Sequence, residues 1–181
     1  MLAQDPVRLE GPAREKAIAT ILAANDIRTT LQFRFTQTRH SSLLTEDLVS
    51  EGRAYFAFPD RVRWETTRPH PAVFVLNAAE ATDRRQQVLL RNVAKASEKG
   101  LINEDDFTVT VYAAPDQCQV DLEPLRRDLG QLFVRITLLT DARTGALRSI
   151  VLSETGGDLT EIQLHAVERG IQIPEELFKK P

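Results

Sequence analysis

Strict alternation of apolar and polar residues dominates the segment Ser50–Glu65. Residues that alternate in this way point to opposite faces of a β-strand. Pro59 and Asp60 interrupt the alternation and supply a tight turn. The pattern predicts a β-hairpin whose apolar faces join into one surface, with these residues on it: Ala54, Phe56 and Phe58 on the first strand, Val62 and Trp64 on the second.

Helical spacing of apolar residues predicts two helices. The first runs from Ala13 to Asn25 behind Pro12, which suits a first helical position, and the second covers Arg85–Gly100. The remaining chain alternates with period two and predicts strands at 30–40, 73–76, 107–113, 117–124, 131–139, 146–154 and 158–167. We expect a short polar strand and turn at 77–84, a turn or short helical piece at 125–129, and an extended tail anchored by Phe178.

The order of these elements predicts the fold class. Strands follow one another through short turns, so the sheet should be antiparallel, and helices do not alternate with strands, so the class is α+β. A sheet of about ten strands must twist and curl, which leaves its concave side for the two helices. We expect a single domain over residues 1–181, with residues 1–11 as a flexible N-terminal segment.

Composition narrows the function classes. The 181 residues are 42% hydrophobic and carry a net charge of −3, enough for one sizeable core and without the basic excess of a nucleic-acid-binding protein. No apolar run approaches the roughly 20 residues of a membrane span, so no stable membrane insertion is expected. Trp64 stands beside Arg61 and Arg63, a combination that also suits single-stranded nucleic acid, but on a strand it faces away from both.

Candidate catalytic and metal-binding groups are weak. Cys118 is the only cysteine, which excludes an internal disulfide, and its apolar neighbours indicate a small buried side chain. No histidine has metal-ligand spacing, and the cluster Glu104–Asp106 reads as a solvated turn. Glu46, Asp47 and Glu51 could support a hydrolase only if they converged in a pocket. We therefore predict no catalytic residue, no metal and no cofactor.

The apolar faces are the main candidate for function. Two interpretations are open: a plain core under the helices, which the residues alone favour, or the lining of a cavity for an acyl chain or another apolar ligand. The second helix adds its own apolar stripe to this surface. The candidate lining residues are Leu31, Phe33, Phe35, Phe56, Phe58, Val62, Trp64, Phe74 and Leu76 on the strands, with Leu89 and Val93 on the second helix.

An ordered set of short motifs resembles the periplasmic outer-membrane lipoprotein carriers, the LolA-like proteins. The motifs run in register from about Phe33 to Phe178. They are Phe35–Gln37, Leu48–Gly52, Phe56, Pro59, Arg63–Glu65, Thr67 with Pro69, Leu122–Pro124, Glu154–Ile162 and Ile173–Pro174 with Phe178. Each piece is short, and the specificity lies in their order.

The resemblance implies an unclosed β-barrel of about eleven strands with helices over its mouth. Such carriers hold lipoprotein acyl chains, or by extension another lipid, between an inner-membrane ABC transporter and an outer-membrane acceptor, without making or breaking a bond. It also implies a monomer in the periplasm, with Leu2–Gln4 as a remnant of a signal-peptide cleavage site. Known members carry an arginine just before the strand proline that helps hold the lid closed, whereas this chain has Phe58 there.

Two further points stay open. Leu43 and Leu44 lie in a predicted loop, where they could touch a membrane or partner or simply anchor the loop. The alternative function is an envelope interaction or sensor domain on the same fold, which binds a peptide or protein without transporting lipid.

Overall fold

The computed structural model describes residues 5–26, 28–59, 61–77 and 84–179; at 84–86, 89, 90, 93 and 97 the description is limited to the backbone. Within these ranges the strands form one antiparallel sheet of ten strands in the order β1-β6-β7-β8-β9-β10-β2-β3-β4-β5. The strands are β1 (Val7–Arg8), β2 (Leu31–His40), β3 (Leu48–Ala57), β4 (Arg61–Arg68), β5 (Ala72–Asn77), β6 (Phe107–Ala113), β7 (Gln117–Pro124), β8 (Phe133–Asp141), β9 (Leu147–Glu154) and β10 (Leu159–Arg169).

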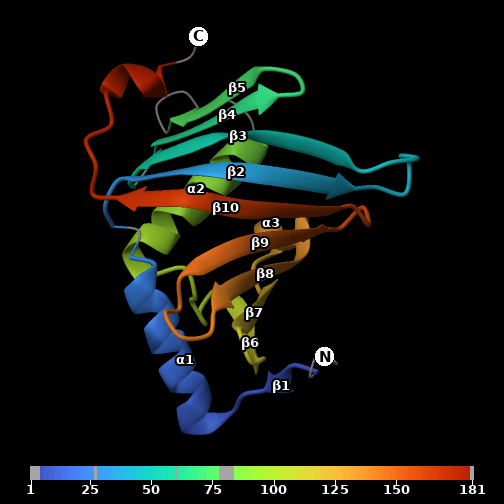
Figure 1. Cartoon of the computed structure of the whole chain (residues 1–181), viewed down its shortest axis with the longest axis vertical. Coiled ribbons are helices and arrows are strands. Elements are labelled where there is room, and N and C mark those ends of the chain that lie inside the picture. Colours follow the sequence, from blue (N-terminus) through green and yellow to red (C-terminus); the bar gives the residue numbers. More distant parts are fainter. Residues whose placement is uncertain (1–4, 27, 60, 78–83, 180–181) are drawn as a thin grey trace.

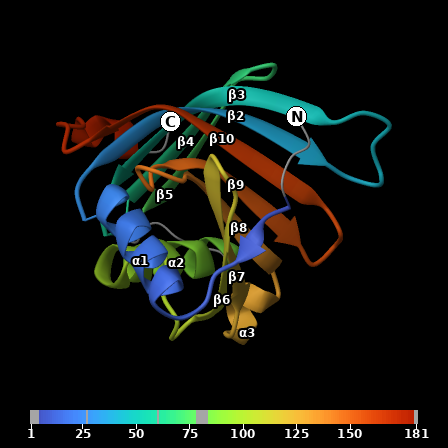
Figure 2. The ribbon, with the colours of Figure 1, turned by 60° about the horizontal axis from the view of Figure 1, so that its bottom comes forward.

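The sheet curves around the two long helices without closing. Its outer strands, β1 and β5, pair only with β6 and β4 among the described strands. Helices α1 (Gly11–Ala24) and α2 (Arg84–Lys99) lie on the concave side, in the mouth of the curved sheet (Figures 1 and 2). The α+β class and the unclosed antiparallel sheet expected from the sequence are confirmed.

The order of the strands explains how distant parts of the chain meet. β10 lies between β9 and β2, so the last strand in the sequence joins the block β2–β5 to the block of β1 and β6–β9 within the one sheet (Figure 1). Leu164 stands opposite Phe35, and Ile162 stands opposite Gln37. Side chains directly opposite in an antiparallel pair share a face, so the apolar residues of β10 join those of β2.

Helix α1 is fixed by apolar contacts and by a close approach to the β8–β9 turn. Its Ile21 is buried in a cluster with Val111, Val120 and Leu138 of the sheet. Gly145 in the turn has φ +72, and a Cβ there would come within 2.8 Å of the Thr20 carbonyl oxygen. A larger residue would suffer both from the left-handed conformation and from the contact.

A second close approach lies in the β3–β4 hairpin, where β3 packs against β2. Gly52 on β3 faces Phe35 on β2, and a Cβ on Gly52 would come within 1.9 Å of the Glu65 carbonyl oxygen and 2.6 Å of the Phe35 ring. Phe35 in turn stacks on Trp64 with ring centroids 4.1 Å apart. The absent side chain of Gly52 thus makes room for the buried aromatic pair.

The two ends of the chain differ from the sequence predictions in detail. Val7 and Arg8, within the segment predicted to be flexible, form β1, and the Leu9 N–H donates to the Val111 carbonyl at 2.8 Å. The tail is extended only as far as Pro174, because Glu175–Phe178 forms the 3₁₀ helix η1, so the extended prediction is wrong there. Phe178 is 3% exposed, which confirms it as an anchor.

Other local predictions are confirmed or fall outside the described residues. The short helix α3 (Arg127–Gly130) overlaps the predicted turn or helical piece, and Cys118 is buried beside Val120 and Leu122. The predicted polar strand at 77–84 lies mostly outside the described residues. The prediction that Glu104–Asp106 is a solvated turn is correct for Glu104 and Asp105, which are exposed. It is wrong for Asp106, which is buried and whose carboxylate accepts hydrogen bonds from Lys95 and Asn103.

Candidate functional site

An apolar cavity lies between the concave face of the sheet and the helices. Its volume is about 170 Å³. Strands β2, β3, β4, β9 and β10 supply most of the wall, and Asn25 after α1, Ala96 of α2 and Leu101 after α2 complete it. The lining residues are Asn25, Leu31, Phe33, Phe56, Phe58, Trp64, Ala96, Leu101, Leu147, Ile150, Ile162, Leu164, Val167 and Arg169.

Aromatic rings form one continuous wall of this cavity. Phe33 stacks on Phe56 at 5.8 Å, and Phe56 stacks on Phe58 at 5.8 Å. Trp64 meets Phe33 edge to face at 6.1 Å. Contacts of this kind hold rings in fixed orientations and add about 0.5–1.5 kcal/mol each beyond the burial itself. The wall is therefore a firm apolar surface.

Asn25 and Arg169 give the cavity polar groups in an otherwise apolar lining. Asn25 is 2% exposed; its amide nitrogen donates to the carbonyl oxygens of Ile21 and Gly145, each at 2.8 Å. Its side-chain oxygen accepts from the Leu147 N–H at 3.0 Å and from the Arg169 guanidinium at 3.1 Å. Partial burial lowers the pKa of Arg169, and the nearby Asp26 carboxylate partly offsets this effect. Asn25 thus joins α1, the β8–β9 turn and β10.

A second apolar cavity adjoins the first under α2. It measures about 270 Å³, and it shares Ala96, Leu101 and Ile150 with the first cavity. Lys95 and Asp106 belong to its lining; the Lys95 ammonium donates to the Asp106 carboxylate at 2.8 Å and lowers the pKa of that carboxyl group. The shared lining residues place the two cavities side by side, with Ala96 of α2 between them.

The structure distributes the candidate lining residues over three environments. Leu31, Phe33, Phe56, Phe58 and Trp64 line the first cavity. Phe35, Val62 and Leu76 share the concave face but are buried in the packing rather than in the cavity wall, and Phe74, opposite Trp64, is 42% exposed. The side chains of Leu89 and Val93 lie outside what the structure describes.

Sequence reasoning missed the part of the lining that β9 and β10 provide. Ile162, Leu164 and Val167 on β10 and Leu147 and Ile150 on β9 all face the cavity. The sequence shows the alternation of apolar and polar residues in both strands, but it does not show which strands pair with them in the sheet. The missing signal was the pairing of β10 with β2 across more than a hundred residues of sequence.

The remaining candidates do not gather into a site. Asp47 pairs with the His40 ring at 2.7 Å, while Glu51 pairs with Arg68. In the described residues, no three histidine, cysteine, aspartate or glutamate side chains are placed to hold a metal ion. Arg61 and Arg63 face away from Trp64, as expected, and contact the C-terminal segment at Glu175 and Leu177.

Leu43 and Leu44 lie at the tip of the β2–β3 hairpin, which extends beyond the neighbouring strands (Figure 1). Leu43 is 92% exposed and Leu44 is 40% exposed. Leu48 and Val49, at the start of β3, are also exposed. None of the helices for which the structure gives coordinates is long and apolar enough to cross a membrane.

Comparison with solved structures finds similar folds at low sequence identity. A LolA superfamily protein from Nitrosomonas europaea is 7% identical, with a TM-score of 0.49 and coverage of 92% of this chain and 97% of that one. MucB, in complex with MucA(peri), is 14% identical, with a TM-score of 0.47 and coverage of 92% and 59%.

Comparison of sequences is more informative. An outer-membrane lipoprotein carrier protein from Alkalilimnicola ehrlichii is 28% identical over 165 residues, 83% of this chain and 73% of that protein. One from Dechloromonas aromatica is 27% identical over 162 residues, 83% and 76%. The profile of the family "Outer membrane lipoprotein carrier protein LolA" matches residues 27–181. This match covers most of the chain, including every strand that faces the cavity, and the protein belongs to the LolA family.

Proposed function

We propose that this protein is a periplasmic carrier that holds the acyl chains of a lipoprotein, or another lipid, in its apolar cavity. The observation that carries the proposal is the cavity itself, with an aromatic wall on one side and residues of α2 and of the end of α1 in its lining. Membership of a carrier family supports the same conclusion. Transfer would run from an inner-membrane ABC transporter to an outer-membrane acceptor, with the protein acting as a monomer and a single domain.

Binding would draw on apolar burial, and no bond would be made or broken. Each buried CH₂ contributes roughly 0.8 kcal/mol, so part of one acyl chain already gives useful affinity. The first cavity measures about 170 Å³. An engineered cavity of about 150 Å³ holds one benzene molecule, so the first cavity has room for only a few carbon atoms and must widen to accept an acyl chain. Displacement of α2 would join it to the adjoining cavity of about 270 Å³.

Control of the opening would rest on apolar contacts at Phe58. Phe58 stacks on Phe56 and lines the cavity, at the position where the resemblance leads us to expect a lid-holding arginine. A lid held by apolar contacts is displaced by an apolar ligand, since ligand and lid compete for the same surface. Leu43 and Leu44 at the hairpin tip are our candidates for contact with a partner or membrane surface.

Trp64 provides a direct test, because it is the only tryptophan and lies in the cavity wall. A lipopeptide with a spin-labelled acyl chain should quench its fluorescence, and native mass spectrometry should show one bound lipopeptide. Phe56→Asp should weaken binding at least tenfold, because a charge would then face the apolar cavity. Phe74→Asp is the matched control, on the same face of the sheet but outside the cavity lining.

The outcomes separate the carrier from the alternative function. If Phe56→Asp fails to fold, Phe58→Ala gives a milder change in the same wall. No quenching and no bound lipopeptide with the folded wild-type protein would refute the carrier proposal and favour an interaction or sensor domain. Equal loss in Phe56→Asp and Phe74→Asp would place the lipid elsewhere.

A further inference from the structure

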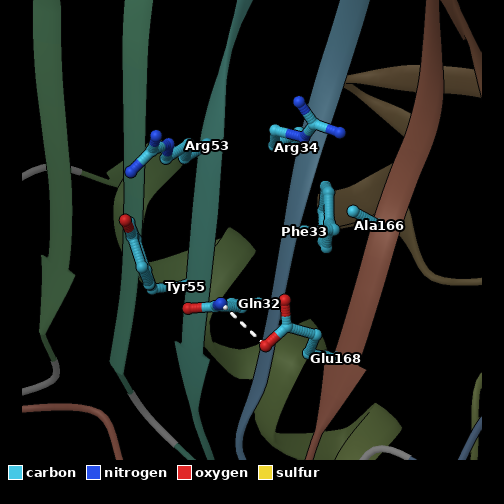
Figure 3. Close-up of a pocket in the computed structure, with 7 residues that line it drawn as sticks. All are labelled: Gln32, Phe33, Arg34, Arg53, Tyr55, Ala166 and Glu168. Carbon is cyan, nitrogen blue, oxygen red and sulfur yellow. Dashed lines mark hydrogen bonds between the residues drawn. The ribbon is translucent and has the colours of Figure 1, made fainter.

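A polar cleft lies on the convex face of the sheet, behind the apolar cavity. It measures about 420 Å³, and it is bordered by Gln32, Phe33, Arg34, Arg53, Tyr55, Ala166 and Glu168 from β2, β3 and β10 (Figure 3). Gln32 and Arg34 alternate along β2 with Leu31 and Phe33, which line the apolar cavity. The two sites therefore lie on opposite faces of β2 and share Phe33.

Two unpaired arginines form one end of the cleft. Arg34 and Arg53 stand directly opposite each other on β2 and β3, and both are exposed. Like charges at such positions destabilise a sheet. Neither guanidinium has a hydrogen bond or ion pair with any residue that the structure describes, although Arg39, Arg63 and Arg68 nearby are all paired.

The acidic residue directly opposite Arg53 on β4 is already engaged. Glu65 stands opposite Arg53 across the β3–β4 pair, but its carboxylate accepts from Arg63 at 3.3 Å. The Tyr55 hydroxyl lies along the same wall of the cleft as Arg53 (Figure 3). This end of the cleft therefore presents two guanidinium groups and a hydroxyl group with capacity to donate.

The other end of the cleft is anionic. One oxygen of Glu168, Oε2, accepts from the Gln32 amide at 3.1 Å (Figure 3). The second oxygen, Oε1, has no partner among the described atoms. A carboxylate can accept about four hydrogen bonds, so Glu168 keeps most of its capacity.

A β-bulge forms the floor between the two ends. Pairing of β10 with β2 shifts register between His165 and Glu168, and Ala166 within the bulge has φ 49. Bulges bend a strand locally and redirect side chains. The bulge turns Glu168 toward the cleft and leaves space beside Phe33, where regular pairing would have placed side chains.

We propose that this cleft binds a small dipolar ligand, in which an oxyanion and a primary ammonium group lie a few bonds apart. Arg34 and Arg53 would hold the oxyanion, since guanidinium groups suit phosphate and carboxylate geometry. Glu168 would accept from the ammonium group. A phosphoethanolamine group has this arrangement, either as a lipid head group or as a free soluble compound.

The surrounding charges favour such a ligand over a general anionic surface. Surfaces that recognise anionic membranes collect about four to eight lysines and arginines. Here Glu168 borders the same cleft as the arginine pair, Glu65 stands opposite Arg53, and the chain as a whole has a net charge of −3. A purely anionic ligand would meet repulsion from Glu168, whereas a dipolar ligand satisfies both ends of the cleft.

Titration of ¹⁵N-labelled protein with glycerophosphoethanolamine tests the proposal. We expect saturable shifts in the amides of β2, β3 and β10 around the cleft, and binding at least fivefold weaker for glycerophosphoglycerol, which lacks the ammonium group. Arg34→Gln combined with Arg53→Gln should weaken both ligands at least tenfold. Glu168→Gln should abolish the preference for the ethanolamine compound while sparing the glycerol compound.

The controls keep the result interpretable. Arg143→Gln removes an exposed arginine of the β8–β9 turn and should change neither affinity. Circular dichroism and thermal unfolding check each variant, and if the double variant does not fold, each single arginine variant replaces it. No saturable shifts at the cleft, or a Glu168→Gln variant with unchanged preference, would overturn the proposal.

A further arm distinguishes the two sources of the ligand. Phosphatidylcholine vesicles with and without phosphatidylethanolamine are sedimented with wild-type and Arg34→Gln/Arg53→Gln protein. Arginine-dependent sedimentation with phosphatidylethanolamine identifies the lipid head group as the source. Binding of the soluble compound without sedimentation identifies a free small molecule, and absence of both refutes the cleft as a binding site. Lipopeptide binding in the apolar cavity is measured separately through Trp64, so failure of one proposal leaves the other testable.

Discussion

Replacement of Gly52 by alanine should destabilise the protein, although alanine is normally the better residue in a strand. The added Cβ would stand 1.9 Å from the Glu65 carbonyl oxygen on β4 and 2.6 Å from the Phe35 ring. The first contact is with backbone, so β3 and β4 must separate by about 1 Å even to reach 3.0 Å. The second contact pushes Phe35 against Trp64, with which it stacks at 4.1 Å.

The magnitude follows from two opposing contributions. Overpacking of a closely packed site costs about 1–3 kcal/mol and sometimes more. Removal of a glycine from a strand returns about 0.5–1 kcal/mol. Because the clash involves backbone, we take the upper part of the first range and expect a net loss of about 1.5–2.5 kcal/mol in the free energy of unfolding. For a chain of this size this lowers Tm by about 3–10 °C.

Urea unfolding and calorimetry of Gly52→Ala measure this loss, and the emission of Trp64 reports the displaced ring. Gly156→Ala is the matched control, because a Cβ at Gly156 meets nothing within 4 Å and its φ is not in the left-handed range. We expect the control to remain within about 0.5 kcal/mol of the wild type. Equal midpoints for the two variants would show that the sheet absorbs the methyl group, and the packing argument would fail.

Three further changes test other parts of the structure. Asn25→Ala should cost about 2–3 kcal/mol in urea unfolding, since it leaves the buried Gly145 carbonyl and Leu147 N–H without their partner; a loss below 0.5 kcal/mol would contradict its joining role. Phe178→Ala should cost about 3–5 kcal/mol through the cavity left under η1, unless the tail detaches without loss of global stability. Lys95 lowers the pKa of Asp106 below its ordinary value of 3.8, so this carboxylate stabilises the fold above about pH 4 and the contribution fades as pH falls through the lower folded-state pKa. Wild type and Asp106→Asn should therefore differ in urea midpoint at pH 6 and converge toward pH 3; a constant difference would contradict the linkage.

Local patterns predicted the strands well because each strand carries its own signal. The bounds of β7, Gln117–Pro124, coincide with the predicted strand, and α2 begins one residue before the predicted helix. β1 escaped detection because it contains only Val7 and Arg8, both exposed, and exists through its pairing with β6. A two-residue strand has no periodicity to read.

The candidate site was harder to predict because it depends on which strands become neighbours. Leu31, Phe33, Phe56, Phe58 and Trp64 were found because β2, β3 and β4 are adjacent in sequence as well as in space. The β9 and β10 residues required knowledge of the β10–β2 pair. Asp106 was misjudged for a similar reason, since its burial depends on Lys95 and Arg126 from other elements.

The strand β2 connects the two proposed sites through its register. Its odd-numbered residues Leu31 and Phe33 line the apolar cavity, and its even-numbered residues Gln32 and Arg34 border the polar cleft. A slip of one residue would exchange the two faces and destroy both sites at once. The pair of Phe35 with Gly52 resists such a slip, because only a glycine opposite the ring leaves space for it. The same small residue that leaves room for the Phe35 ring therefore also holds Arg34 opposite Arg53, and Gly52→Ala should perturb ligand binding on both faces of the sheet.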